Sequence, residues 1–560
     1  MAVEVIKKDG SSGPAGNPDA DMASSESSDI KSNWATAGYY TGIYVNDEEK
    51  AIHGRRMMNR IDKPRTKSIA VPIDPNRRVS LTGKSQSPDS GDDDADVSVG
   101  KQMELEAGNA IQYRTCTWPK TAALLFSEYI CLAIMSFPYS YSVLGLVPGI
   151  ILTVVQAAFV LYTSLIVWEF CIRHPEVKDV CDVGQTLFFG KRWAWWFTGV
   201  MFLLNNTFIQ GFHCLVGAKY LNTMTNGGIC TVGFSAIMAV VSFLCSMPRT
   251  FSALARLATV SAFFTFISVL LAAIFAGIED HPGGGSADTA WPKQGKVELL
   301  VVPLAGTSFV EGMNAFLNIS YTFIGQITLP SFIAEMKEPN DFPKALWAVT
   351  MAEIIVFSLI GAVIYGFTGT NYNVAPAFGS LGNETYLKVS FSFMIPTLIF
   401  LGVLYASVSA RFVFFRLFSG TKHMGNHTVV GWASWAGILA CLWVMAFIIA
   451  EVIPFFSYLL SLMSALFDSF FGWIYWGFAY MRMRDADMGR DFYKKRGVRG
   501  WIGLCVNIFI IAFGFFNLVA GTYASVDEIV MAYANGGFGG PFGCEYNGLY
   551  IWRKADAFSS

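Results

Sequence analysis

Two long apolar segments of this sequence are interrupted in the same way by a proline. The first contains Ala133-Ile-Met-Ser-Phe-Pro138 and the second contains Gly325-Gln-Ile-Thr-Leu-Pro330. Proline removes a backbone donor and clashes with the preceding turn, so a helix breaks or kinks there. Inside a bilayer, the freed backbone groups are tolerated only where they line a protected cavity or bind a ligand. Because paired broken helices mark the binding site of many secondary transporters, the two segments predict a solute site near mid-membrane.

The composition agrees with an integral membrane protein. Hydrophobic residues make up 53% of the chain and charged residues only 15%, against roughly 25% charged in soluble domains. From residue 119 onward, apolar stretches long enough to cross a bilayer follow one another. We predict an all-α integral membrane protein with eleven transmembrane helices, at about 120–143, 147–172, 194–221, 230–247, 253–278, 309–335, 345–367, 389–413, 429–450, 453–480 and 500–520.

The ends of the chain differ from this membrane domain, which we expect to cover residues 115–525. Residues 1–114 are rich in Ser, Asp, Gly and Lys without periodicity, which predicts a disordered cytosolic tail that could bind cytosolic regulators. In it, Ser80 after Arg77-Arg78 and Ser87 before Pro88 are candidate phosphorylation sites, although such matches are common in solvated tails. Residues 526–560 are expected to form an extracellular C-terminal tail.

The distribution of lysine and arginine predicts the orientation. With the N-terminus in the cytosol, the cytosolic loops hold most of these residues, as the positive-inside rule requires. The odd number of spans then leaves the C-terminus outside. Asn383-Glu-Thr385, a glycosylation sequon, falls in an outside loop. Cys230 and Cys544 are the cysteines expected at or beyond the outer surface, where they could form a disulfide.

Ionisable residues inside the membrane are costly and often functional. Glu128 lies in the first span, shortly before the expected break at Ala133–Met135, and is our candidate for a proton-coupling residue. The alternative is a structural pair with a neighbouring helix. Glu353 and Asp468 are favoured as structural because neither lies on a broken helix.

Further polar residues cluster in the spans at 194–221, 309–335 and 389–413. They line a solute path, or they hold helices together through hydrogen bonds. Half-helix ends at the breaks suit a ligand that carries both a carboxylate and an ammonium, as an amino acid does. The substrate-binding candidates among them are Asn206, Gln210, Asn318, Ser320, Tyr321 and Thr322, with His213 on the same face as the first two; Ser407 and Ser409 are ion-site candidates.

No catalytic or cofactor-binding constellation is visible in the sequence. The sequence contains no phosphate-binding glycine loop, no His-Glu-x-x-His motif and no cysteine pair at zinc spacing. We therefore expect neither an enzyme nor a bound metal or cofactor, and the balanced charge disfavours a nucleic acid partner. Transport without a nucleotide would be secondary, and the expected partners are a small solute and the lipid bilayer.

Residues 127–145, with Ser136-Phe-Pro138, and residues 318–337, followed by Glu338-Pro339, resemble the amino acid/auxin permease family. The closer resemblance is to fungal neutral amino acid permeases of the methyltryptophan-resistance type, over about residues 112–530. It implies a LeuT-like fold, with a 5+5 inverted repeat and an eleventh helix appended. It also implies substrate contacts from Leu132, Ala133, Ile134 and Met135, although Cys131 and Ala133 replace the glycine pair of many relatives.

The resemblance implies import of neutral aliphatic and aromatic amino acids across the plasma membrane, by proton symport with alternating access. Two alternatives stay open. A sensor with a transporter fold would bind an amino acid without accumulating it, and a vacuolar exporter would carry the same substrates across another membrane. The sequence does not distinguish proton from sodium coupling.

Overall fold

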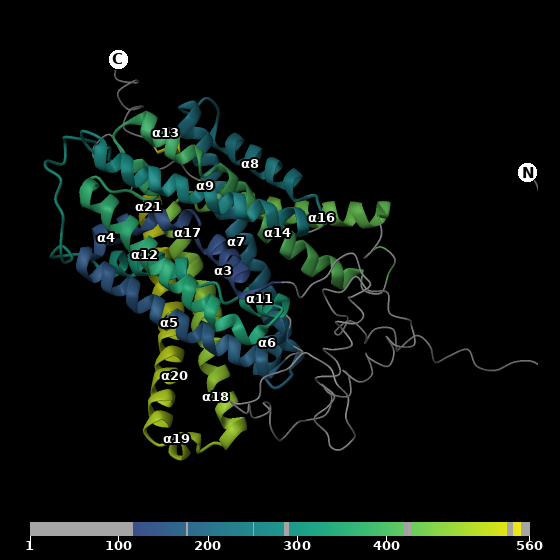
Figure 1. Cartoon of the computed structure of the whole chain (residues 1–560). Helices are drawn as coiled ribbons and strands as arrows, with labels where there is room; N and C mark the ends of the chain where they lie inside the picture. The colour runs from purple at the N-terminus through teal and green to yellow at the C-terminus, as the bar shows by residue number, and fades with distance from the viewer. Residues whose placement is uncertain are drawn as a thin grey trace, which may run out of the picture.

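The computed structural model describes residues 116–174, 177, 179–249, 251–284, 290–418, 421, 423, 427–534 and 541–549. For residues 251–259 and 415 it describes the backbone alone. The predicted tail at 1–114, with Ser80 and Ser87, lies outside the described residues. Within them the regular structure is helical, and two isolated β-bridges join Cys116 to Met336 and Pro282 to Leu381. Long helices run side by side in a bundle, and a hairpin of α18, α19 and α20 projects from it (Figure 1).

The first five predicted spans form one half of the bundle, which begins with a broken helix. Its elements are α3 (Trp118–Tyr129), η1 (Leu132–Ser136), α4 (Phe137–Leu144), α5 (Leu146–Arg173), α6 (Val180–Leu187), α7 (Arg192–Thr225), α8 (Thr231–Ser246) and α9 (Phe251–Ile278). α3 and the segment Leu132–Leu144 meet at an angle of 47°. The proline-bearing first span is therefore bent, as expected.

The second half also begins with a broken helix. Its elements are α10 (Phe309–Phe323), α11 (Leu329–Glu335), η2 (Pro339–Asp341), α12 (Phe342–Thr368), η3 (Ala377–Ser380), α13 (Glu384–Ser392), α14 (Ile395–Leu417), α16 (Val429–Val452), α17 (Phe456–Met463), η4 (Ser464–Ile474) and α18 (Tyr475–Met488). α19 (Phe492–Lys495), α20 (Val498–Phe516), η5 (Asn517–Gly521) and α21 (Thr522–Ala534) follow. The last span thus continues to Ala534, past the boundary expected at residue 525.

Each of the eleven predicted spans corresponds to a helix or a broken helix in the described residues. By length and composition, eight helices suffice to cross a membrane, or nine with the bent first pair. The others fall short for a physical reason: α8 has 16 residues, and α10 and α11 are separated by the non-helical stretch 324–328. The protein is an all-helical membrane protein, and both halves start with an interrupted span.

A disulfide fastens the C-terminal segment to one end of the bundle, which we call the disulfide side. Cys230, directly before α8, is bonded to Cys544. Nearby, the Leu549 N–H donates to the Thr223 hydroxyl at 3.0 Å, and Lys219 is hydrogen-bonded to Asn547. The expected pairing is therefore present, and residues 541–549 pack against the bundle instead of extending away from it. Exposed Asn383 lies on the same side, at the start of α13.

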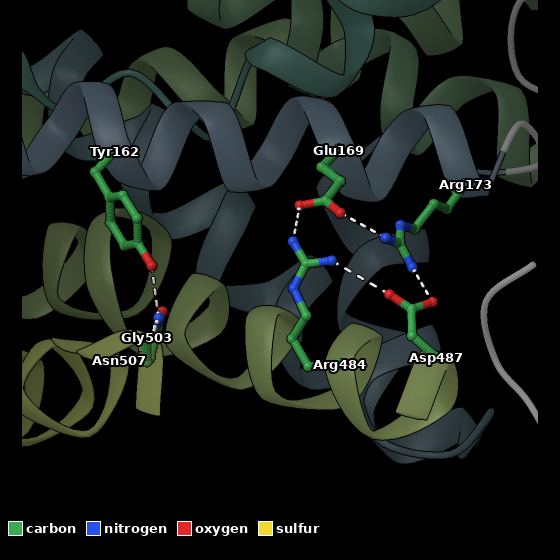
Figure 2. Close-up of polar contacts among 7 residues, drawn as sticks. All are labelled: Tyr162, Glu169, Arg173, Arg484, Asp487, Gly503 and Asn507. Atoms are coloured by element: carbon green, nitrogen blue, oxygen red, sulfur yellow. Dashed lines mark hydrogen bonds and ion pairs between the residues drawn. The ribbon is translucent and has the colours of Figure 1, made fainter. Parts of the chain in front are cut away.

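At the opposite end, four charged residues join α5 to α18 (Figure 2). Arg173 contacts Glu169 at 2.5 Å and Asp487 at 2.6 Å, while Arg484 contacts Glu169 at 2.6 Å and Asp487 at 3.2 Å. Each guanidinium thus meets both carboxylates, so the charges balance in a closed square. α20 is joined to α5 as well, because the Asn507 amide of α20 donates to the Tyr162 hydroxyl of α5 at 2.6 Å.

Removing one carboxylate from this square should destabilise the protein. Asp487→Asn leaves two guanidinium groups facing Glu169 alone, and the Arg173 and Asp487 side chains are only 4% and 11% exposed. Breaking a buried pair costs roughly 3–5 kcal/mol, and we expect about 1–3 kcal/mol here because Glu169 stays partly solvated. Thermal unfolding of purified protein in detergent measures this loss of stability. Asp341→Asn is the control, since its partner Lys344 is 61% exposed; equal melting temperatures for both variants would contradict the prediction.

Candidate functional site

An internal cavity lies where the two broken helices meet. Three other helical spans complete its wall, so residues far apart in the sequence face the same space. Its lining comes from the first break (Glu128, Tyr129, Cys131), α7 (Asn205, Ile209, His213), the second break (Tyr321, Thr322, Ile324, Gly325, Ile327), α14 (Leu401, Tyr405) and η4 (Asp468, Phe471).

The first break lies earlier than the sequence suggested. Ile130 and Cys131 leave the helical conformation, and a 3₁₀ turn over Leu132–Ser136 leads into α4. Cys131 lines the cavity. The predicted contact residues Leu132, Ala133, Ile134 and Met135 are fully buried in that turn and are not among the lining residues. The proline acts at the start of α4, so the unwound backbone ends several residues before it.

The second break spans residues 324–328 and packs closely against the first. Ile324 has extended backbone angles, and the chain becomes helical again at Leu329, with Pro330 in the first turn of α11. A Cβ added to Gly325 would come within 1.9 Å of the Tyr129 ring. Gly325 is therefore required because a tyrosine from the other broken helix occupies the space that a side chain would need.

Glu128 connects the two breaks to a third span. Its carboxylate accepts a hydrogen bond from the Tyr405 hydroxyl of α14 at 3.1 Å. The Thr328 hydroxyl lies 3.4 Å from its other oxygen, and the single proton of that hydroxyl is shared with the Gly325 carbonyl at 2.9 Å. Thr328 ends the second break, since it directly precedes α11. A change in the protonation of this carboxyl would alter hydrogen bonds among three spans at once.

Asp468 also faces the cavity, although the sequence favoured a structural role for it. It lies in η4, where the chain forms a π-helix between α17 and α18, and its side chain is 7% exposed. The span is continuous but not a regular α-helix. Sequence reasoning missed this residue because the single glycine of the segment, Gly472, does not distinguish a π-helix from an ordinary helix. A π-helix is a local widening common at functional sites.

On α7 the residues that line the cavity are neighbours of those expected. Asn205, Ile209 and His213 face it, with a spacing of four residues. Asn206 instead donates to the Ser409 hydroxyl of α14 at 3.1 Å, and Gln210 donates to the Asn206 carbonyl of its own helix. The predicted polar face is rotated by one residue, so Asn206 and Gln210 serve helix packing while His213 reaches the cavity.

Of the remaining candidate residues, some line the cavity and others pack helices against one another. Tyr321 and Thr322 line the cavity. Asn318 donates to the Ser457 hydroxyl of α17, and the Ser320 hydroxyl accepts from Gln156 of α5 at 2.7 Å. Ser407 and Ser409 are buried in α14 and are not among the cavity residues. Among the described residues, no group of three or more His, Cys, Asp or Glu could hold a metal ion.

Comparison with known proteins identifies the family. Residues 114–526 match the family model described as transmembrane amino acid transporter protein. The chain is 30% identical over 450 residues to a Neurospora crassa protein named N amino acid transport system protein, covering 80% of this chain and 92% of that one. A transmembrane transporter of Gibberella moniliformis is 29% identical over 469 residues, covering 83% and 94%.

Among solved structures, the chain is similar to MhsT in complex with L-phenylalanine. The likeness covers 73% of this chain and all of that one, with a TM-score of 0.46 and 12% identity. The family model covers most of the membrane domain, including both breaks and every cavity residue. This chain belongs to the transmembrane amino acid transporter protein family and is a transporter, not an enzyme.

Proposed function

We propose that this chain imports neutral amino acids across the plasma membrane by proton symport, as its resemblance to fungal neutral amino acid permeases implies. Membership of an amino acid transporter family and the name of the Neurospora crassa relative, an amino acid transport system protein, support an amino acid as the substrate. The cavity wall combines carboxyl, amide and hydroxyl groups with Ile209, Leu401 and Phe471. Such a wall suits a zwitterion with an apolar side chain.

The observation that carries proton coupling is the position of Glu128. This carboxyl group contacts both the second break and α14, so a change in its protonation changes the hydrogen bonds to these two elements. In an alternating-access cycle, these are the elements that must rearrange between the outward-open and inward-open states. Protonation converts one carboxylate oxygen from an acceptor into a donor. The hydrogen bonds from Tyr405 and Thr328 are therefore stronger when Glu128 is charged than when it is neutral.

The proposed orientation has the disulfide side outside the cell. The Cys230–Cys544 disulfide requires an oxidising compartment, and Asn383 on the same side is exposed and available for glycosylation. The side chain of Asn383 caps α13 with its oxygen, which accepts from the N–H groups of Thr385 and Tyr386 and leaves the nitrogen free for a glycan. The arginine-rich end with Arg173 and Arg484 then lies in the cytosol, as the positive-inside rule requires.

The test is uptake of radiolabelled leucine and phenylalanine into permease-deficient cells that express the full chain, with and without a protonophore. Accumulation that the protonophore abolishes supports the proposal. Sodium-dependent accumulation that resists the protonophore would contradict proton coupling. Saturable binding at the cell surface without accumulation would favour a sensor, and activity found only in isolated vacuoles would favour the exporter.

A further inference from the structure

The cavity holds two carboxyl groups and no fixed positive charge. Glu128 and Asp468 both face it, and among the described lining residues there is no lysine or arginine. A buried carboxylate needs a counter-charge or a full set of hydrogen bonds. A transported proton can neutralise one of the two groups, and a cationic group of the substrate could pair with the other.

The two carboxyl groups differ in their hydrogen bonds. Both Glu128 oxygens have a donor within hydrogen-bond distance: Tyr405 donates to one, and the Thr328 hydroxyl, which also bonds to the Gly325 carbonyl, lies by the other. For Asp468 the Oδ2 atom is buried and has no hydrogen-bond partner within the described part of the chain. A buried acceptor without a hydrogen-bond partner is costly unless a ligand completes it. Asp468 is therefore the carboxyl group with capacity left for a donor.

The π-helical segment holds Asp468 against the second break. Phe471, three residues later, lines the same cavity, so both side chains leave one face of η4. Gly472 lets this segment approach closely, because a Cβ there would lie 2.9 Å from the Ile324 side chain. Ile324 and Gly325 line the cavity as well. The carboxylate is thus fixed beside the unwound backbone, where a small substrate reaches both.

We propose that Asp468 binds the α-ammonium group of the transported amino acid. The ammonium nitrogen carries three donors and a positive charge, which match an unpaired carboxylate oxygen. Glu128 already has donors inside the protein, so we assign the transported proton to Glu128. This inference rests on the proposed function, since it takes a zwitterionic amino acid as substrate.

The experiment compares ligands with and without the amino group. Purified full-length protein in detergent is titrated with L-leucine and with 4-methylpentanoate, which is leucine without its ammonium. The wild type should prefer leucine strongly, because the bare acid leaves Asp468 unpaired and repels it. Asp468→Asn should weaken leucine binding by roughly 10- to 100-fold and remove most of that preference. The control Glu353→Gln, at a residue outside the cavity lining, should keep the preference for leucine.

Several results overturn the inference. If Asp468→Asn keeps the wild-type preference for leucine, or if Glu128→Gln alone loses it, Asp468 does not bind the ammonium, and the proposed transport function stands. If the wild type binds neither leucine nor, in a parallel titration, phenylalanine, the proposed function fails and this inference fails with it. Should Asp468→Asn not fold, a structure of the wild type with leucine decides: the ammonium nitrogen lies within about 3.2 Å of Asp468, or it lies elsewhere and the inference is wrong.

Discussion

Replacing Gly325 by alanine should reduce amino acid uptake by about ten- to a hundredfold. The new Cβ would lie 1.9 Å from one carbon of the Tyr129 ring and 2.5 Å from its hydroxyl oxygen. The ring must then swing into the cavity, or the two breaks must separate, and either change removes space from the site. Overpacking of this kind costs about 1–3 kcal/mol, which corresponds to that loss of affinity. Initial rates of leucine uptake at varied concentration measure the effect.

Gly312 provides a matched control on the same broken span. It lies within α10, and a Cβ added there meets no atom within 4 Å. Gly312→Ala should therefore transport like the wild type, and it should reach the membrane in the same amount as Gly325→Ala. If Gly325→Ala keeps the wild-type KM at equal surface expression, the contact between the two breaks does not shape the site.

Glu128→Gln should uncouple uptake from the proton gradient. In the wild type, we expect uptake to rise as the external pH falls, because in the proposed cycle the Glu128 carboxyl binds a proton before the site closes. The glutamine side chain keeps an acceptor for Tyr405 but cannot carry a proton. Each proton that crosses 100 mV supplies about 2.3 kcal/mol, enough for roughly fortyfold accumulation. The variant should lose this accumulation and its pH dependence while it still exchanges labelled for unlabelled leucine.

The control for this variant is another carboxyl group inside the membrane. Glu353 of α12 is 3% exposed and does not line the cavity. Glu353→Gln should keep both the pH dependence and the accumulation. Substrate-induced proton currents in the two variants give a second readout. Wild-type currents in Glu128→Gln would assign the proton to a different group, and the other titratable groups of the cavity, Asp468 and His213, would be tested next.

Gly325→Ala and Glu128→Gln disturb the same junction in different ways. Gly325 controls how closely the two breaks approach, while Glu128 controls the hydrogen bonds that join them to α14. The first substitution should lower affinity at every pH, whereas the second should leave affinity and remove the driving force. Measuring uptake and exchange side by side therefore separates loss of the site from loss of coupling.

The sequence by itself determined the helical membrane fold and the location of its two interrupted spans. Hydrophobic length is a local property, because a bilayer requires about 20 apolar residues for each crossing. Proline acts locally too, so both breaks could be located to within a few residues. The family resemblance, carried by the segments around those breaks, agrees with the family model over residues 114–526.

Only the tertiary structure decided which polar residues share the cavity. A rotation by one residue on α7 exchanges Asn206 for Asn205, and the sequence pattern alone allows either face. Asp468 enters the wall from a π-helical segment whose Gly472 lies close to the Ile324 side chain of the second break. The partners of Glu128 come from residues 328 and 405, far along the chain. Side-chain direction in a membrane helix depends on neighbouring helices, since the apolar solvent around the bundle does not specify an inward face by itself.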